Sequence, residues 1–269
     1  MSKTTEQASN HRNLEERSLA ELAEYINKED QTVAFSVGKQ LPNIVALIEA
    51  VFAKLEAGGR LFYIGSGTSG RLGVVDASEC PPTFGVEHGV VIGVIAGGDP
   101  AIRKAVENAE DDENQGFRDL EAHHINSKDI VIGISASGTT PYVKGTLLAC
   151  NAAGISTGSI CCNTDSEIGK ISNFPVDCPV GPEFVTGSTR MKAGTAQKLI
   201  LNMITTSVMI KLGHVQDNKM VDMQLSNAKL VDRGTKMVME QTGLVYDAAK
   251  VLLLKQGSVR TAINHFRRK

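Results

Sequence analysis

Hydrophobic and polar positions along this chain change their period several times, and each change predicts the start of a new strand or helix. Continuously apolar short runs are typical of parallel strands covered on both faces, and longer amphipathic segments are typical of helices. The predicted strands are 61–64, 90–96, 130–134, 156–161 and one near 176–180. Helices are predicted over 41–57, from residue 69, and over 100–109, 142–153 and 193–212. This alternation predicts an α/β fold with a doubly wound parallel sheet flanked by helices, which binds ligands at the carboxyl ends of its strands.

The two ends of the chain follow other patterns. Residues up to about 17 are polar and are expected to form an arm, followed by a short helix over 18–27 with Ser18 as its N-cap. After residue 212 the pattern is purely helical, with helices predicted over 219–241 and 245–255. We therefore expect three parts: an N-terminal arm and helix (1–40), an α/β domain (41–219) and a small helical appendage (220–269).

Composition restricts the kinds of partner. The 28 Lys and Arg residues nearly balance the 30 Asp and Glu residues, which gives no reason to expect a nucleic acid or an acidic membrane as partner. The most apolar long stretch, 193–212, contains Gln197, Lys198 and Asn202 and therefore predicts a buried helix rather than a membrane span. Five cysteines, without C-x-x-C spacing, favour reduced thiols. With no apolar signal segment at the N-terminus, we expect a soluble, cytoplasmic protein.

The most informative segment is the apolar run 61–64 followed by G-S-G-T-S-G-R. Glycines allow backbone N–H groups to approach a ligand closely, and the start of the next helix adds the positive end of a dipole. Hydroxyl side chains add further hydrogen-bond donors without a cation, a combination that suits a phosphate monoester. The predicted phosphate ligands in this loop are Ser66, Gly67, Thr68 and Ser69.

The same residues match the dinucleotide fingerprint G-x-G-x-x-G, which expects an acidic residue about 20 positions further on. Asp99, the acid that follows the next strand, lies 29 positions past Gly70, and Cys80-Pro81-Pro82 is predicted to break the intervening helix. A Walker-type loop is excluded because no Gly-Lys-Ser/Thr follows. A glycine turn without a ligand remains an alternative, but the three hydroxyls favour phosphate.

Two further segments supply hydroxyl groups. S-A-S-G-T-T-P follows the strand predicted at 130–134, so it is expected to converge with the first loop on one ligand, although helix capping alone is an alternative. The segment 181–192 adds hydroxyls, a carboxylate and two cations before the long apolar helix, with a solvated capping segment as its alternative. The additional candidate ligands are Ser135, Ser137, Thr139, Thr140, Ser188 and Lys192. His123 and His124 lack the spacing of metal ligands, so no metal site is expected.

The two hydroxyl loops resemble the sugar isomerase (SIS) domain, which binds phosphosugars. G-S-G-T-S-G-R-L-G-V-V-D-A-S-E-C-P-P-T-F-G (65–85) and V-T-G-S-T-R-M-K-A-G-T-A-Q-K (185–198) resemble the N-acetylmuramic acid 6-phosphate etherases, with the resemblance running from about residue 18 to about 263. D-A-S-E-C-P-P is much more specific than either glycine loop. The resemblance implies a SIS domain over 41–219 and an incomplete appendage, because the chain ends before the helical C-terminus usual in the family.

The family cleaves the D-lactyl ether at C3 of the phosphosugar, giving N-acetylglucosamine 6-phosphate and D-lactate without a metal or organic cofactor. The resemblance implies elimination followed by hydration, with Glu79 and Glu110 matching the catalytic glutamates. We expect Glu79 to act as the acid and Glu110 as the base. Glu110 is predicted at the C-terminal end of the helix opened by Asp99, among acidic neighbours that would raise its pKa.

Two other functions remain open. A catalytically silent SIS module would sense a phosphosugar, and an aldose–ketose isomerase would share the phosphate loops and use Glu183 as its base. D-A-S-E-C-P-P, which contains Glu79, favours the etherase over both. A homodimer is expected because the helix at 193–212 offers more apolar surface than one face of a sheet needs. The predicted partner is a small-molecule phosphosugar.

Overall fold

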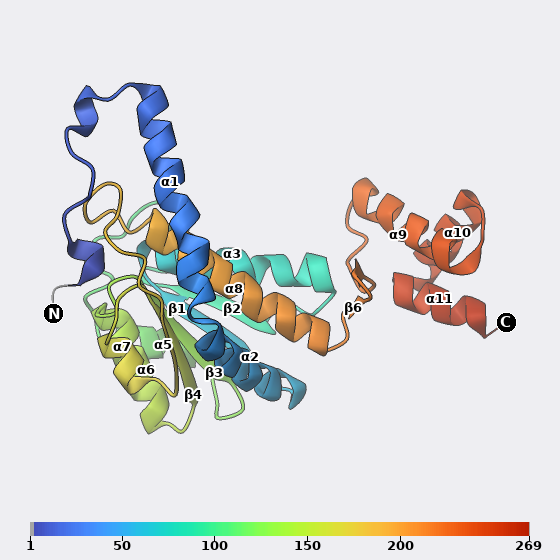
Figure 1. Ribbon diagram of the computed structural model, residues 1–269. Helices are drawn as coiled ribbons and strands as arrows, with labels where there is room; N and C mark the ends of the chain where they lie inside the picture. Colours follow the sequence, from blue (N-terminus) through green and yellow to red (C-terminus); the bar gives the residue numbers. More distant parts are fainter. Residues whose placement is uncertain (1–2, 269) are drawn as a thin grey trace. The chain divides into compact units, whose positions relative to one another are not determined.

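A computed structural model describes residues 3–268 of the chain, which forms two compact units (Figure 1). Unit 1 comprises Met1–Ser78 and Val90–Thr206, and unit 2 comprises Glu79–Gly89 and Ser207–Lys269. Helices α3 (Gly67–Phe84) and α8 (Lys192–Lys211) contribute residues to both units. Among the described residues, no helix is long and apolar enough to span a membrane.

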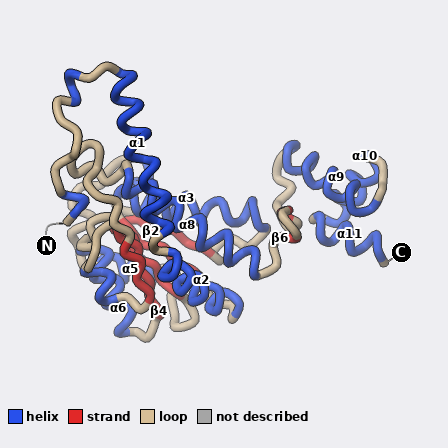
Figure 2. Tube along the Cα trace, in the orientation of Figure 1, coloured by secondary structure: helices blue, strands red, loops and turns tan. Residues whose placement is uncertain are grey.

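Unit 1 is built on a five-stranded parallel sheet with the strand order β2-β1-β3-β4-β5, and helices pack around it (Figure 2). The predicted doubly wound α/β fold is therefore confirmed. Strand β1 pairs with β3 in a register that sets Gly65 beside Ile134, so the loops that follow these two strands leave the same edge of the sheet. The strands are β1 (Leu61–Gly65), β2 (Val91–Ile95), β3 (Ile130–Ser135), β4 (Ser156–Cys161) and β5 (Phe174–Asp177).

Most helices of unit 1 lie where the apolar spacing predicts them. Ser18 caps α1 and forms a capping box with Glu21, as the sequence suggests, but the helix extends well past the predicted end at residue 27. The core between sheet and helices includes Phe62, Tyr142 and Leu147, all fully buried. The helices are α1 (Leu19–Gly38), α2 (Leu41–Glu56), α4 (Pro100–Arg103), α5 (Gln115–Glu121), α6 (Pro141–Ala152) and α7 (Glu167–Ile171).

Helix α3 contradicts the prediction that the helix breaks before the two prolines. It continues through Pro81 and Pro82 to Phe84, and Gly85 N–H then donates to the Pro81 carbonyl at 2.9 Å. Proline fits the helical φ angle, but it lacks the N–H and its ring crowds the carbonyl four residues earlier, so α3 forms its last turn at a cost rather than stopping before Pro81. Gly85, with φ of +70°, follows the last helical residue.

The predicted helix over 100–109 is also wrong. Helix α4 ends at Arg103, Lys104 adopts an extended conformation, and the Asp99 side chain forms no capping hydrogen bond. Glu110 therefore lies in a turn and not at a helix end. The expected effect of a helix dipole on the Glu110 carboxylate has no structural basis.

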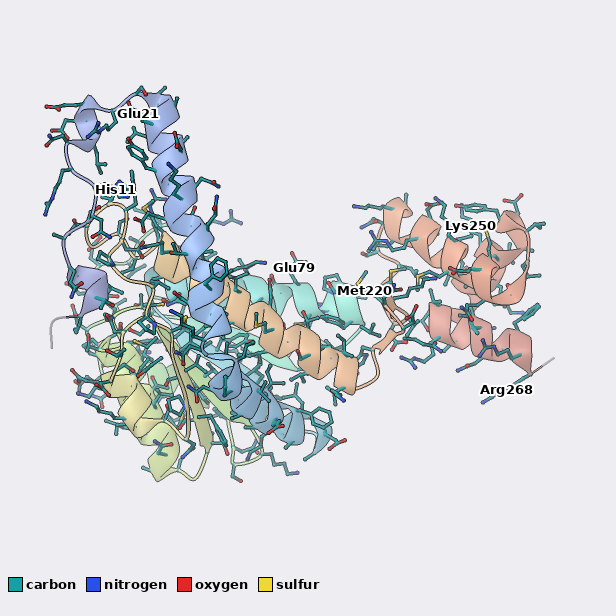
Figure 3. All side chains as sticks on the ribbon, viewed as in Figure 1. His11, Glu21, Glu79, Met220, Lys250 and Arg268 are labelled. Carbon is teal, nitrogen blue, oxygen red and sulfur yellow. The ribbon has the colours of Figure 1, made fainter. Side chains whose placement is uncertain are left out.

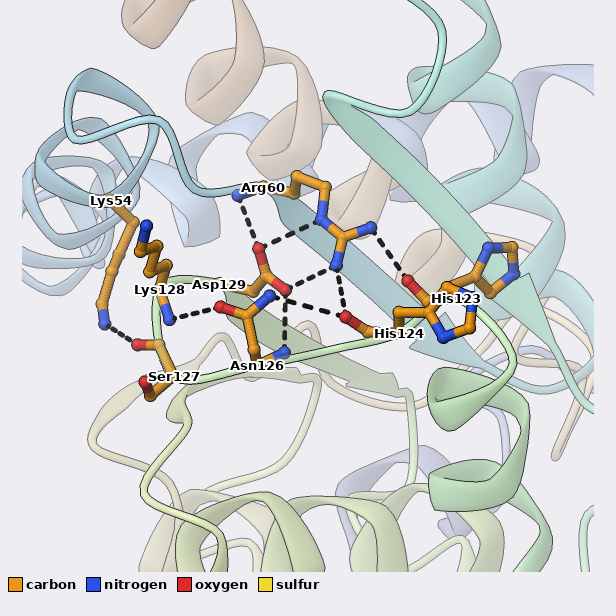
Figure 4. Close-up of polar contacts among 8 residues, drawn as sticks. All are labelled: Lys54, Arg60, His123, His124, Asn126, Ser127, Lys128 and Asp129. Atoms are coloured by element: carbon orange, nitrogen blue, oxygen red, sulfur yellow. Dashed lines mark hydrogen bonds and ion pairs between the residues drawn. The ribbon is translucent and has the colours of Figure 1, made fainter.

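An ion-pair cluster closes the amino ends of β1 and β3 (Figure 4). The buried Asp129 carboxylate accepts hydrogen bonds from the Arg60 backbone N–H, Nε and Nη2 at 2.8–3.1 Å, and from the Asn126 N–H at 3.0 Å. The Arg60 guanidinium also donates to the carbonyls of His123 and His124. This cluster fixes the turn that leads into β3.

Unit 2 has a helical core, as predicted for the appendage. Met223, Val238 and Leu253 are among its buried side chains. The segment after residue 212 is not purely helical, however, because β6 and β7 form a two-residue antiparallel pair that is too short to leave a periodic signal. The elements of unit 2 are β6 (Val215–Gln216), β7 (Lys219–Met220), α9 (Ala228–Thr242), α10 (Tyr246–Gln256) and α11 (Val259–Arg267).

Candidate active site

A cavity of about 250 Å³ lies in unit 1 where β1 and β3 end. It brings together seven of the ten predicted binding residues and one of the two predicted catalytic glutamates. Neither hydroxyl loop supplies a cation to its wall. The lining residues are Glu6, Ser66, Gly67, Thr68, Ser69, Glu110, Ser135, Ala136, Ser137, Thr140, Gly187 and Thr189.

The first hydroxyl loop requires its glycines for close backbone approach. A Cβ atom on Gly65 would lie 2.8 Å from the Gly70 nitrogen, and one on Gly70 would lie 2.6 Å from Ile95 Cγ1. Gly67 adopts a left-handed φ of +50° and is the first residue of α3. The backbone therefore turns sharply out of β1 and presents the N-terminus of an 18-residue helix to the cavity, which favours an anion.

The second hydroxyl loop is held by hydrogen bonds among its own side chains. Ser135 Oγ lies 2.8 Å from Thr140 Oγ1 and accepts a hydrogen bond from the Gly138 N–H at 3.1 Å. Ser137 Oγ lies 3.1 Å from Thr139 Oγ1. Each hydroxyl group can donate one hydrogen bond and can also accept. If these groups donate to an anion instead of to one another, their oxygens can still accept hydrogen bonds and are not left buried and unpaired.

Glu110 contacts the first loop directly. Its Oε2 atom accepts a hydrogen bond from Ser66 Oγ at 2.7 Å, and its carbonyl accepts one from the Tyr142 N–H at 2.9 Å. The side chain is exposed and also lines an adjoining cavity of about 180 Å³, together with Arg71 and several small apolar residues. A carboxylate is thus fixed beside the hydroxyl loops, in a position to exchange a proton with a ligand there.

Three predicted binding residues do not line this cavity. Thr139 lines a neighbouring cavity of about 240 Å³ and accepts a hydrogen bond from Lys3 Nζ at 2.7 Å. Lys192 is 3% exposed and pairs with Glu29 at 2.5 Å. Ser188 is not among the lining residues of either cavity, whereas the next residue, Thr189, lines the first.

The second predicted glutamate, Glu79, belongs to unit 2. It lies on α3 with an exposed side chain (Figure 3). Its neighbour Cys80 is 2% exposed. Glu79 is therefore available to a ligand at the surface of its own unit, and its partnership with Glu110 remains a prediction.

Glu183, the base of the isomerase alternative, has a structural role here. The side chain is 1% exposed, and its two oxygens accept hydrogen bonds from the Lys192 N–H at 2.8 Å and the Ala193 N–H at 2.9 Å. Burial raises the pKa of Glu183 above its ordinary value. A carboxylate that caps the first turn of α8 through both oxygens is poorly placed to remove a proton from a ligand.

Sequence reasoning missed Glu6, Ala136, Gly187 and Thr189 as lining residues. Thr189 lies one position from the predicted Ser188. The sequence therefore indicates the correct segment but not which of its hydroxyl residues lines the cavity. Glu6 comes from the polar N-terminal segment, in which no motif marks it. Sequence reasoning also missed Gln197, which accepts a hydrogen bond from Ser69 Oγ at 3.0 Å and is 1% exposed.

The chain is similar to known proteins both in its fold and over nearly its whole sequence. The profile of the glucokinase regulatory protein N-terminal SIS domain matches residues 43–151. A phosphoheptose isomerase from Francisella tularensis has a similar fold, with a TM-score of 0.57 at 17% identity over 72% of this chain and 99% of that one. Unit 1 is therefore a SIS-type domain.

Two relatives are similar over nearly their whole length. The N-acetylmuramic acid 6-phosphate etherase of Christiangramia forsetii is 58% identical over 97% of this chain and 95% of its own. That of Bacteroides fragilis is 57% identical over 98% of this chain and 94% of its own. The chain belongs to the N-acetylmuramic acid 6-phosphate etherase family, which confirms the resemblance seen in the sequence.

Proposed function

We propose that this protein is an etherase that cleaves the D-lactyl ether of N-acetylmuramic acid 6-phosphate with water, releasing N-acetylglucosamine 6-phosphate and D-lactate. Membership of the etherase family supports the reaction and the substrate. One structural observation carries the chemistry: the Glu110 carboxylate accepts a hydrogen bond from Ser66 inside the hydroxyl-lined cavity. This arrangement holds a proton-transfer group beside a site for a phosphate ester.

The two hydroxyl loops bind the phosphate in this proposal. Thr68 of the first loop donates a hydrogen bond to its oxygens, and the backbone at Gly67 adds the start of α3. Ser66 and Ser69 donate to the phosphate by giving up their bonds to Glu110 and Gln197, which leaves the Glu110 carboxylate free to accept a proton. The second loop contributes Ser135, Ser137 and Thr140. Thr139 supports the site from outside the cavity through the second loop, and Lys192 does so through the start of α8. Ser188, next to the lining residue Thr189, stays a predicted ligand.

The reaction proceeds by elimination and then hydration. In the open-chain sugar, the C1 aldehyde makes the C2 proton acidic, and Glu110 removes it. The C2–H electrons form a C2–C3 double bond as the C3–O bond breaks, and Glu79 gives a proton to the departing lactyl oxygen. Water then adds at C3 of the conjugated intermediate as the Glu79 carboxylate takes its proton, and Glu110 returns a proton to C2, which restores both side chains. One carboxylate as base and one as acid suffice for these proton transfers.

The test follows the C2 proton and the lactate separately. The parent protein should release D-lactate from N-acetylmuramic acid 6-phosphate and should exchange the C2 proton with deuterium from solvent. Glu110→Gln should lose both, whereas Glu79→Gln should lose lactate release and keep exchange. If Glu110→Gln keeps exchange and Glu79→Gln loses it, the two roles are reversed. If both variants release lactate at the parent rate, the mechanism is wrong.

The working unit in this proposal is a homodimer. The apolar surface of α8 in unit 1 is largely used in the core, where Ala193, Ala196 and Ile200 are fully buried. The most exposed large apolar side chains of unit 1 lie instead on α1, where Leu19 is 86% and Phe35 is 76% exposed. Light scattering at assay concentration tests the proposal, and a fully active monomer would contradict it.

A further inference from the structure

The N-terminal segment 3–11 is built into unit 1 by buried hydrogen bonds. Thr5 is fully buried, and Asn163 is 3% exposed. The Asn163 side chain accepts a hydrogen bond from the Thr5 N–H at 3.2 Å and donates one to Thr5 Oγ1 at 2.9 Å. Ser9 is 6% exposed and donates to the Phe184 carbonyl at 2.7 Å. Buried and mutually satisfied polar groups fix a segment in place, so this one is part of the folded unit.

The same asparagine holds the second hydroxyl loop. Asn163 Nδ2 lies 3.1 Å from the Ala136 carbonyl and 3.3 Å from the Ser137 carbonyl. One buried side chain therefore connects the N-terminal segment to the loop that lines the cavity. The segment and the loop keep a fixed distance from each other as a result.

Glu6 lies in the chain between the two anchors, Thr5 and Ser9, and lines the same cavity as Ser66 and Ser137. Its side chain is exposed, and within residues 3–268 its carboxylate forms no hydrogen bond or ion pair. A carboxylate accepts hydrogen bonds and donates none, so it repels a phosphate but binds an alcohol. A ligand that suits the whole cavity has both a phosphate for the hydroxyl loops and hydroxyl groups for Glu6.

We propose that Glu6 is a substrate-contacting residue whose carboxylate accepts hydrogen bonds from the hydroxyl groups of the sugar chain while the two loops hold the phosphate. The N-terminal segment thereby completes the site and makes it selective for a polyhydroxylated phosphate ester over free phosphate. The identity of that ester rests on the proposed function, whereas the division of the cavity into a phosphate part and an alcohol part rests on its lining.

The proposal predicts opposite effects on two probes. In Glu6→Ala, N-acetylglucosamine 6-phosphate should bind about 10- to 100-fold more weakly, because a charged hydrogen-bond acceptor for its hydroxyls is lost. Inorganic phosphate should bind a few-fold more tightly to the same variant, because a negative charge beside it is removed. Glu6→Gln should tighten phosphate binding in the same way but weaken sugar phosphate binding less, since the amide oxygen still accepts. Titration calorimetry measures all of these affinities.

Glu15→Gln is the matched control, because Glu15 is an exposed carboxylate of the same N-terminal region that does not line the cavity. It should change neither affinity. If Glu6→Ala changes both affinities in the same direction, or neither, the inference is wrong. A parent protein that binds the sugar phosphate but releases no D-lactate would contradict the proposed function alone, so the two failures are distinguishable.

Discussion

Polar groups at the two ends of strands β1 and β3 differ in burial and in how completely they are hydrogen-bonded. At the amino ends, Asp129 is 1% exposed and both of its oxygens are bonded, chiefly to Arg60. At the carboxyl ends, the hydroxyls of Ser135 and Thr140 bond mainly to each other, and Glu110 is exposed with Ser66 as its hydrogen-bond donor. Groups fully paired within the chain stabilise the fold, whereas groups paired only with their neighbours can exchange those bonds for a ligand. We therefore expect stability and function to be separated along the same two strands.

The largest effect that tests this separation is on the reaction rate. Glu110→Gln should lower D-lactate release about 10²–10⁴-fold, the usual contribution of a positioned acid or base. The urea midpoint should stay close to that of the parent, since the side chain is exposed. Glu107→Gln is the control, because Glu107 is an exposed carboxylate that lines only the adjoining cavity. A large loss of stability in Glu110→Gln would show that polar groups at the carboxyl ends of the strands also stabilise the fold.

The next effect is expected at the amino end. Asp129→Ala should lower the free energy of unfolding by about 3–5 kcal/mol, because it leaves the partly buried Arg60 guanidinium without its anion. Activity per folded molecule should stay at the parent level. Lys54→Ala removes an exposed hydrogen bond to the Ser127 carbonyl and should change the free energy of unfolding by less than about 0.5 kcal/mol. Urea denaturation measures both, and an unchanged Asp129→Ala midpoint would contradict the stabilising role of the cluster.

A single hydroxyl at the carboxyl end should have a smaller effect, limited to binding. Ser137→Ala should weaken the binding of N-acetylglucosamine 6-phosphate by about 1.5–3 kcal/mol, the value of one hydrogen bond to a charged group. Ser78→Ala is the control, since that exposed hydroxyl donates only to the Val75 carbonyl within α3. Equal affinities of Ser137→Ala and the parent would remove Ser137 from the phosphate site.

The smallest expected effect concerns pH. Burial alone would raise the pKa of Glu29, but hydrogen bonds from Lys192 and His11 hold it below its ordinary value of 4.5. A carboxyl group with a lowered pKa in the folded state stabilises the fold above its unfolded-state pKa and loses this contribution as the pH falls through the folded-state value. Glu29→Gln should lower stability at neutral pH, because it leaves the buried Lys192 ammonium without its anion. The smaller, pH-dependent part of the effect is a reduced further loss of stability below pH 4.5. Glu24→Gln, which removes only an exposed pair with Lys28, should leave the pH profile unchanged.

Local patterns in the sequence predict the sheet and the first two loops well. A buried parallel strand is an uninterrupted apolar run, so β3 and β4 start at the predicted residues. Glycines and hydroxyls follow directly after such runs, so their position at one edge of the sheet follows from the fold. These features are determined by residues close together in the sequence, so one sequence is enough to predict them.

Features that depend on distant partners were not predictable in the same way. The charge of Lys192 suggests a phosphate ligand until its ion pair with Glu29 is known. Glu183 reads as a free loop carboxylate, yet its burial and its hydrogen bonds at the start of α8 give it a capping role. The turn that holds Glu110 replaces a predicted helix because α4 ends after four residues, and no Gly or Pro in 101–109 indicates this end.

The hydrogen bonds that hold the N-terminal segment also determine when, during synthesis of the chain, the segment can be fixed in place. Thr5 pairs with Asn163 across 158 positions, and Ser9 pairs with Phe184 across 175. At roughly 5–20 residues per second, these partners are made about 8–35 s after the segment itself is synthesised. The first residues to be made therefore wait for partners made much later, and β1 and β3 of a nascent chain are synthesised before Glu6 can be fixed at the site.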